Sequence, residues 1–111
     1  LTFELVHNYG AAYGILQHQR GFLLCISLGV VIGGLVFAKK IIQSPWSHVG
    51  LIFLCAGALG NFLDRALLGY VIDFINIGIL PVFNCADIWI NIAAGCFIME
   101  IIDDQKKRRH L

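Results

Sequence analysis

Long apolar runs separated by short polar segments dominate the chain. The runs cover residues 21–38, 46–63 and 82–102. A helix needs roughly 20 apolar residues to cross the hydrocarbon core of a bilayer, within a usual range of about 17–25. Pro45 directly precedes the second run and suits the first turn of a helix. The pattern therefore predicts three membrane-spanning helices.

Two further segments have the pattern of short strands. Residues 1–9 alternate apolar and polar positions, and residues 66–80 are rich in Val, Ile, Phe and Tyr. Strands at a membrane surface must pair, because their backbone groups need hydrogen-bond partners there. We therefore expect a small sheet on the outer ends of the helices, within a single membrane-embedded domain that covers residues 1–111.

The composition supports lipid as the solvent. The chain is 59% hydrophobic and 14% charged, whereas soluble domains average roughly 45–50% apolar and about 25% charged residues. A soluble chain of this length could not bury so much apolar surface. The net charge of +1 says little, and no nucleic-acid partner is expected.

The basic residues predict the orientation. Lys39 and Lys40 lie between the first two runs, and residues 106–109 are all Lys or Arg. Two crossings separate these places, so they lie on the same side, and the positive-inside rule assigns that side to the cytoplasm. The C-terminus is then cytoplasmic, and residues 1–20 and 64–81 lie outside.

Three aspartates, Asp64, Asp73 and Asp87, converge on the outer side. A carboxylate within a spanning segment is costly and usually marks a functional site or an ion pair. Asp64 has Arg65 beside it, which favours a structural role. Asp73 and Asp87 have no adjacent cation, so each is either part of a site or a capping or satisfied interface group.

Two unpaired carboxylates suggest a pair that shares one proton. Close carboxyl groups cannot both ionise easily, so one pKa rises while the other stays low. Such a pair can activate water and polarise a carbonyl, as aspartyl peptidases do, without a metal or cofactor. The sequence has neither HExxH nor GxSxG. A transporter that uses the acids as ion sites and a structural fragment that uses them in helix packing remain alternatives.

Three stretches resemble the lipoprotein signal peptidases, also called signal peptidase II. These are VHNYGAAYGIL at 6–16, GALGNFLDRALLGYVIDFI at 57–75 and PVFNCADIWI at 81–90. They contain the family's N-x-G-A-A-[FY], G-N-x-x-D-R, V-x-D-F and F-N-x-A-D blocks in the family's order. The resemblance covers nearly the whole chain.

The resemblance implies an aspartyl endopeptidase that cuts a prolipoprotein just before its diacylglyceryl-modified cysteine. Asp73 and Asp87 match the catalytic pair, and Asp64 and Gly10 match supporting motif positions. The remaining matched residues would line the site and hold the substrate backbone: Asn8, Asn61, Arg65 and Asn84.

The resemblance also implies the location, the fold and the partners. The family fold is a four-helix transmembrane bundle with a small outer β-cradle, in the bacterial inner membrane, with its site on the outer face. Against that pattern, we expect this chain to lack the family's first helix and to form a bundle of three. Its expected partners are the modified prolipoprotein, membrane lipids and globomycin-type inhibitors.

Overall fold

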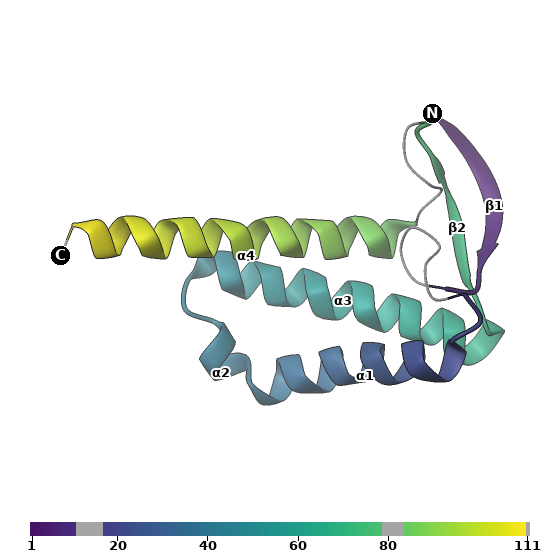
Figure 1. Cartoon of the computed structure of the whole chain (residues 1–111), viewed down its shortest axis with the longest axis horizontal. Helices are drawn as coiled ribbons and strands as arrows, with labels where there is room; N and C mark the ends of the chain where they lie inside the picture. The colour runs from purple at the N-terminus through teal and green to yellow at the C-terminus, as the bar shows by residue number, and fades with distance from the viewer. Residues whose placement is uncertain (11–16, 79–83, 111) are drawn as a thin grey trace.

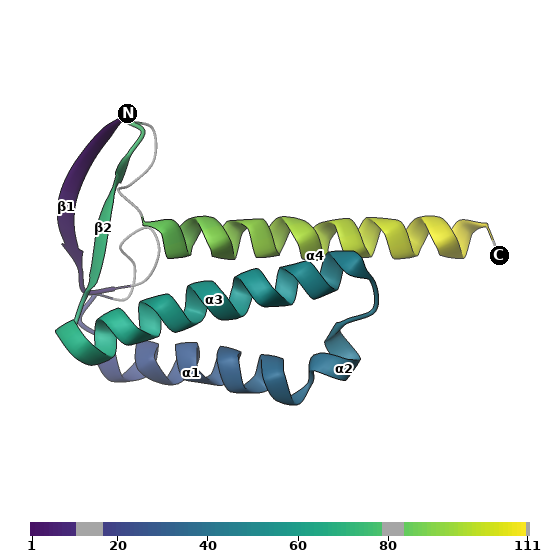
Figure 2. The ribbon, with the colours of Figure 1, turned by 180° about the vertical axis from the view of Figure 1, so that it is seen from behind.

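The computed structural model describes residues 1–10, 17–78 and 84–110. The three long helices lie side by side in one layer, with α3 between α1 and α4 (Figure 1). The sheet crosses one end of this layer, where α1 and α4 begin and α3 ends (Figure 2). The elements follow in the order β1 (Thr2–Asn8), α1 (Arg20–Val36), α2 (Ala38–Ile41), α3 (Pro45–Leu68), β2 (Val71–Asn76) and α4 (Cys85–Arg109).

Two of the described helices, α3 and α4, are long and apolar enough to cross a membrane. Only 28% of the apolar window of α3 and 11% of that of α4 is buried inside the protein, unlike the core helix of a soluble domain. Helix α1 is apolar but shorter, at 17 residues. The helical, membrane-capable architecture is thus confirmed, whereas the number of three spans stays a prediction.

The first apolar run does not form one helix over 21–38. Helix α1 ends at Val36, and the chain turns at Phe37 before the short helix α2 begins. Neither proline nor glycine marks this interruption in the sequence. Lys39 and Lys40 indicated the end of the apolar run but not the turn at Phe37, two residues earlier.

The second run extends beyond its predicted end at residue 63. Helix α3 continues to Leu68, so residues 66–68 are helical and not part of a strand as predicted. The polar residues Asn61 and Arg65 of α3 turn inward to hydrogen-bond partners, so they do not end the helix. The true stop signal is Gly69, whose left-handed backbone (φ of 86°) closes the last turn.

The third run is displaced toward the C-terminus relative to the predicted 82–102. Helix α4 begins at Cys85 and continues to Arg109, while residues 82–83 lie outside the described part of the chain. Charge pairs one turn apart support the added turns. Lys107 lies 3.5 Å from Asp103, and Arg108 lies 3.1 Å from Asp104.

The predicted sheet is confirmed as an antiparallel pair of strands. In its register, Val6 lies opposite Asp73, and Asn8 lies opposite Val71. An irregularity between Phe3 and Val6 shifts the pairing along β1. Residues 79–80 of the second predicted strand lie outside the described residues. The sheet therefore places Asn8 at one end of β1, near the helix ends.

Helices α3 and α4 pack tightly against each other at Gly57. A Cβ added there would lie 2.6 Å from Cγ1 of Ile90 and 2.8 Å from the backbone oxygen of Ala86. Both distances are shorter than van der Waals contact, so only glycine fits. The close approach brings the first turn of α4 against the polar second half of α3.

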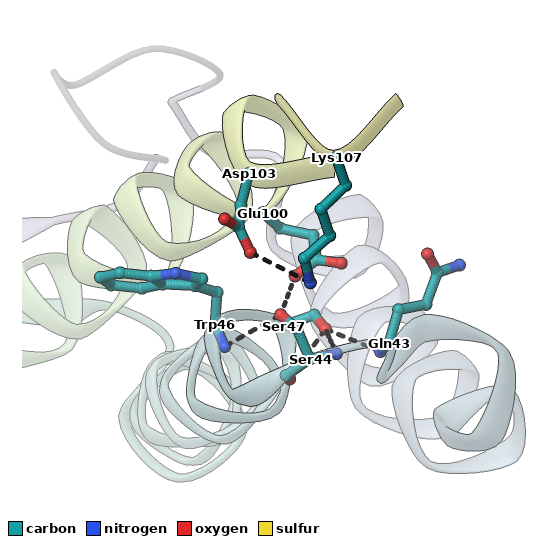
Figure 3. A network of polar contacts seen from close by, with 7 residues as sticks. All are labelled: Gln43, Ser44, Trp46, Ser47, Glu100, Asp103 and Lys107. Atoms are coloured by element: carbon teal, nitrogen blue, oxygen red, sulfur yellow. Dashed lines mark hydrogen bonds and ion pairs between the residues drawn. The ribbon is translucent and has the colours of Figure 1, made fainter. Parts of the chain in front are cut away.

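A polar network joins α3 to α4 at the end of the molecule away from the sheet (Figure 3). Ser44 caps α3, and its hydroxyl donates a hydrogen bond to the Glu100 carboxylate. The fully buried Ser47 hydroxyl accepts from the backbone N–H groups of Gln43, at 2.8 Å, and Ser44, at 3.1 Å. These bonds satisfy backbone donors at the helix start and act as a structural connection.

Candidate functional site

Buried polar side chains gather where the sheet meets the helix ends. Five of them are at most 9% exposed, and they come from β1, α3, β2 and the residue that precedes α4. These residues are Asn8, Asn61, Arg65, Asp73 and Asn84. Buried polar groups need hydrogen-bond partners, so their contacts define the site.

Asp73 lies at the centre of this group, in β2, and is only 3% exposed. The Asn8 side-chain amide donates to Oδ2 of Asp73 at 2.8 Å. The Asn84 side-chain amide donates to Oδ1 at 3.0 Å. Each carboxyl oxygen therefore accepts one hydrogen bond, from residues 65 and 11 positions away in the chain.

Asn84 also holds the second aspartate. Its side chain caps α4 by accepting from the backbone N–H of Asp87 at 3.0 Å. In return, Oδ2 of Asp87 accepts from the backbone N–H of Asn84 at 3.2 Å. Asp87 thus completes a capping box and does not itself occupy the cap position. The structure brings Asp73 and Asp87 to one site through a single residue that contacts both carboxylates.

Asn61 and Arg65 extend the site from α3. Oδ1 of Asn61 accepts from the Asn84 amide at 3.4 Å, and the Asn61 amide also interacts with Asp87. Nη2 of Arg65 donates to the backbone oxygen of Gly10 at 2.7 Å. Within the described part of the chain, Nε of Arg65 is buried and has no hydrogen-bond partner. It is therefore a buried donor that no acceptor among the described residues satisfies.

Asp64 is adjacent to Arg65 in the chain, and its structural role stays a prediction. In residues 1–10, 17–78 and 84–110 there is no ion pair between them, although they are adjacent. The charge of Arg65 interacts most strongly with Asp87, then with Asp73, and least with Asp64. Neighbouring residues on a helix point in different directions, and only Arg65 turns toward the site.

Burial raises the pKa of Asp73 from its ordinary value of 3.8 to about 6. The hydrogen bond from Asn8 opposes this rise, and the nearby negative charge of Asp87 adds to it. Arg65 and the amide of Asn84 lower the pKa by smaller amounts. A carboxyl group with a pKa near neutrality can both release and take up a proton.

This pKa predicts a pH-dependent effect of Asp73→Asn on stability. Because the folded-state pKa lies above 3.8, ionisation destabilises the folded protein as the pH rises from about 4 through about 6. Asparagine has no such ionisation. The variant's stability relative to wild type should therefore increase by about 1–3 kcal/mol between pH 4 and pH 7.5.

Thermal unfolding in detergent at both pH values measures this difference. Asp103→Asn, which removes a carboxylate at the far end of α4, is the control and should show no comparable change. An Asp73→Asn melting temperature that differs from wild type by the same amount at both pH values would contradict the raised pKa.

Two residues at the site were not predicted as members of it. Nε2 of Gln17 donates to Oδ1 of Asn8 at 3.1 Å. The Arg20 guanidinium donates to the backbone oxygens of Arg65, at 2.8 Å, and Ala66, at 2.9 Å. Arg20 thereby satisfies carbonyl groups in the last turn of α3. A flanking polar stretch before a spanning helix looks like ordinary surface in a sequence, so no local signal indicated these contacts.

Among the described residues, amide and guanidinium groups surround the acids. In the described ranges, no group of three or more His, Cys, Asp or Glu residues could hold a metal ion. The polar partners of Asp73 and Asp87 are amides and one arginine. This donor set suits hydrogen bonding to a backbone or a water molecule.

Comparisons with known proteins identify relatives of this chain. Residues 1–103 match the family described as signal peptidase (SPase) II. A lipoprotein signal peptidase of Brevibacillus brevis is 40% identical over 92% of this chain and 70% of its own length. One from Parasynechococcus marenigrum is 38% identical over 96% of this chain and 69% of its own length.

A solved structure of a bacterial membrane enzyme has the same fold. It superposes with a TM-score of 0.86 at 34% sequence identity. The match covers 95% of this chain and 67% of the solved chain. The structural match to a membrane enzyme is therefore consistent with the family that the sequence comparisons show.

Proposed function

This chain belongs to the signal peptidase II family of bacterial membrane proteases, and we propose that it uses Asp73 and Asp87 to cut prolipoproteins before a diacylglyceryl-modified cysteine. The observation that carries this proposal is the double contact of Asn84, whose side chain binds Asp73 and whose backbone binds Asp87. One residue thereby fixes two acids that come from β2 and α4.

The two acids can divide the work of peptide hydrolysis. A water molecule between the carboxyl groups would give a proton to one of them as it attacks the scissile carbonyl carbon. The other, in its protonated form, would donate a hydrogen bond to the carbonyl oxygen. Asp73 suits proton exchange because its pKa of about 6 places both charge states within reach. The proton then passes to the leaving amine.

The free N–H of Arg65 supports a role in substrate binding. This group is buried beside the acids and lacks an acceptor among the described residues. A backbone carbonyl of an extended substrate would supply that acceptor and remove the cost of an unsatisfied donor. Asn8, Asn61 and Asn84 would then hold the acids, the substrate backbone, or both, while Gly10 anchors Arg65.

The position of the site suits a lipid-anchored substrate. It lies at the ends of the helices and not at their midpoint (Figure 1). A transporter holds its ion sites near the bilayer midplane, so this position counts against that alternative. We place the site at the outer face of the bacterial inner membrane, where α1, α3 and α4 form three spans of the family's four-helix bundle. The C-terminus of α4 is then cytoplasmic.

The test uses two synthetic precursor peptides that differ only at the cysteine. One carries the diacylglyceryl group, and the other carries a small alkyl group on the same sulfur. We expect cleavage of the first peptide alone, with a product mass that places the cut directly before the modified cysteine. A globomycin-type inhibitor should stop this cleavage, and a chelator should not.

Three results would contradict the proposal. The first is equal cleavage of both peptides, which would show that the diacylglyceryl group does not determine specificity. The second is a cut elsewhere in the peptide. The third is loss of activity on addition of a chelator, which would indicate a metal-dependent mechanism and not catalysis by two carboxyl groups.

A further inference from the structure

We propose that Gln17 is a positioning residue of the peptidase site, which holds the Asn8 amide so that its NH2 group faces Asp73. This inference rests on the proposed function. The starting observation is a relay of side chains: Gln17 donates to Asn8 at 3.1 Å, and Asn8 donates to Asp73 at 2.8 Å. Gln17 lies between β1 and α1 and does not contact either catalytic acid in the hydrogen bonds of the described chain.

The orientation of the Asn8 amide matters because its two ends have opposite chemistry. The NH2 end stabilises a carboxylate, whereas the carbonyl end would repel it. The two ends have almost the same shape, so packing cannot distinguish them. Hydrogen bonds must do so. Oδ1 of Asn8 accepts from the backbone N–H of Gly10 at 2.8 Å and from Gln17.

These two donors act together but are not equivalent. The Gly10 N–H lies two residues away and forms a local turn with Asn8. Gln17 reaches Asn8 from nine residues away and so joins the start of α1 to the end of β1. A second donor on Oδ1 also strengthens the hydrogen bond that the NH2 group gives to Asp73, because linked hydrogen bonds polarise one another.

Gln17 is itself held by its neighbours. The backbone N–H of His18 donates to the backbone oxygen of Tyr9 at 3.0 Å, and the two rings stack with centroids 5.1 Å apart. Arg20 binds two carbonyl groups at the end of α3. The segment from Gln17 to Arg20 is therefore attached on both sides, which fixes the place from which the Gln17 amide donates.

The experiment compares Gln17→Leu and Gln17→Glu with Gln19→Leu in the full chain. Leucine keeps most of the side-chain volume but cannot donate. Glutamate keeps the shape, but its carboxylate would attract the NH2 end of Asn8 away from Asp73. Gln19 is the matched control because it flanks the same helix and its side chain makes no capping hydrogen bond.

Two readouts are needed, one of which does not depend on activity. The first is kcat and KM for the lipidated peptide across pH. The second is the titration midpoint of the Asp73 carboxyl carbon, followed by NMR on protein labelled at aspartate, with Asp73→Asn used to assign the signal. Asn8 lowers the pKa of Asp73, so a weakened contact should raise that midpoint.

For Gln17→Leu we expect kcat to fall about 2- to 10-fold, the range of one hydrogen bond between neutral groups. KM should stay within about twofold, and the Asp73 midpoint should rise by roughly 0.5 pH unit. Gln17→Glu should lose more activity than Gln17→Leu. Gln19→Leu should match wild type in all three quantities.

An unchanged Asp73 midpoint in both Gln17 variants would overturn the inference, even if kcat falls. So would equal effects of Gln17→Leu and Gln19→Leu. If the wild-type protein cleaves no peptide but the midpoint still moves, the proposed function fails while the positioning of Asp73 by Gln17 stands. The two proposals are therefore tested separately.

Discussion

Asp73→Asn is expected to lower the rate of cleavage of a diacylglyceryl-modified precursor by at least about 10³-fold, within the range of general acid–base catalysis. The amide has nearly the shape of the carboxyl group but cannot exchange a proton. Its oxygen can still accept one of the two hydrogen bonds that Asn8 and Asn84 now give to Asp73. The protein should therefore fold and insert while its chemistry is lost.

Single-turnover assays with excess protein in detergent micelles measure this loss directly. The fraction of protein inserted and its melting temperature must be recorded in parallel, so that inactivity is not confused with misfolding. Asp103→Asn, at the far end of α4, should keep wild-type activity. A turnover rate of Asp73→Asn within tenfold of wild type would exclude Asp73 as a catalytic acid or base.

Asp87 caps α4 in the structure and is a catalytic acid in our proposal, and two substitutions should separate these roles. Asp87→Asn should lower the cleavage rate as strongly as Asp73→Asn. It should keep the cap of α4, because an amide oxygen can still accept from the backbone N–H of Asn84. Asp87→Ala should lose both activity and that hydrogen bond. The alanine variant should therefore be less stable than the asparagine variant by about 1 kcal/mol.

Melting temperatures and cleavage rates of the two Asp87 variants form one data set. Equal stability of the two would show that the reciprocal bond of the capping box contributes nothing measurable. Substantial cleavage by Asp87→Asn would leave Asp87 only its role in capping α4 and would disprove the proposed catalytic pair. An active Asp87→Asn with an inactive Asp73→Asn would indicate a single-acid mechanism.

The sequence predicted which residues lie at the site better than it predicted the interactions between these residues. Motif resemblance identified Asn8, Asn61, Arg65 and Asn84. In the structure Asn8 and Asn84 bind Asp73, Asn61 interacts with Asp87, and the charge of Arg65 interacts with both acids. Their roles in catalysis and binding stay predictions. Although Asp64 and Arg65 are adjacent in the chain, they form no ion pair among the described residues. The direction of a side chain on a helix depends on its packing partners.

Helix ends were predicted less well than helix positions. Hydropathy indicates where a chain is apolar, but a helix ends where its backbone hydrogen bonds find other partners. Polar residues near Arg65 looked like the end of α3, although the helix continues to Leu68. The contacts of Gln17 and Arg20 depend on segments 9 and 45 residues away, so only the folded chain could show them.

The role of Asn84 as the cap of α4 has a consequence for thermal inactivation. Helix ends open locally more readily than the rest of a fold. When the first turn of α4 frays, Asp87 loses its backbone partner and Asp73 loses an amide donor in the same event. We therefore expect catalysis by the proposed pair to fail when this one helical turn opens, below the temperature at which the three long helices separate.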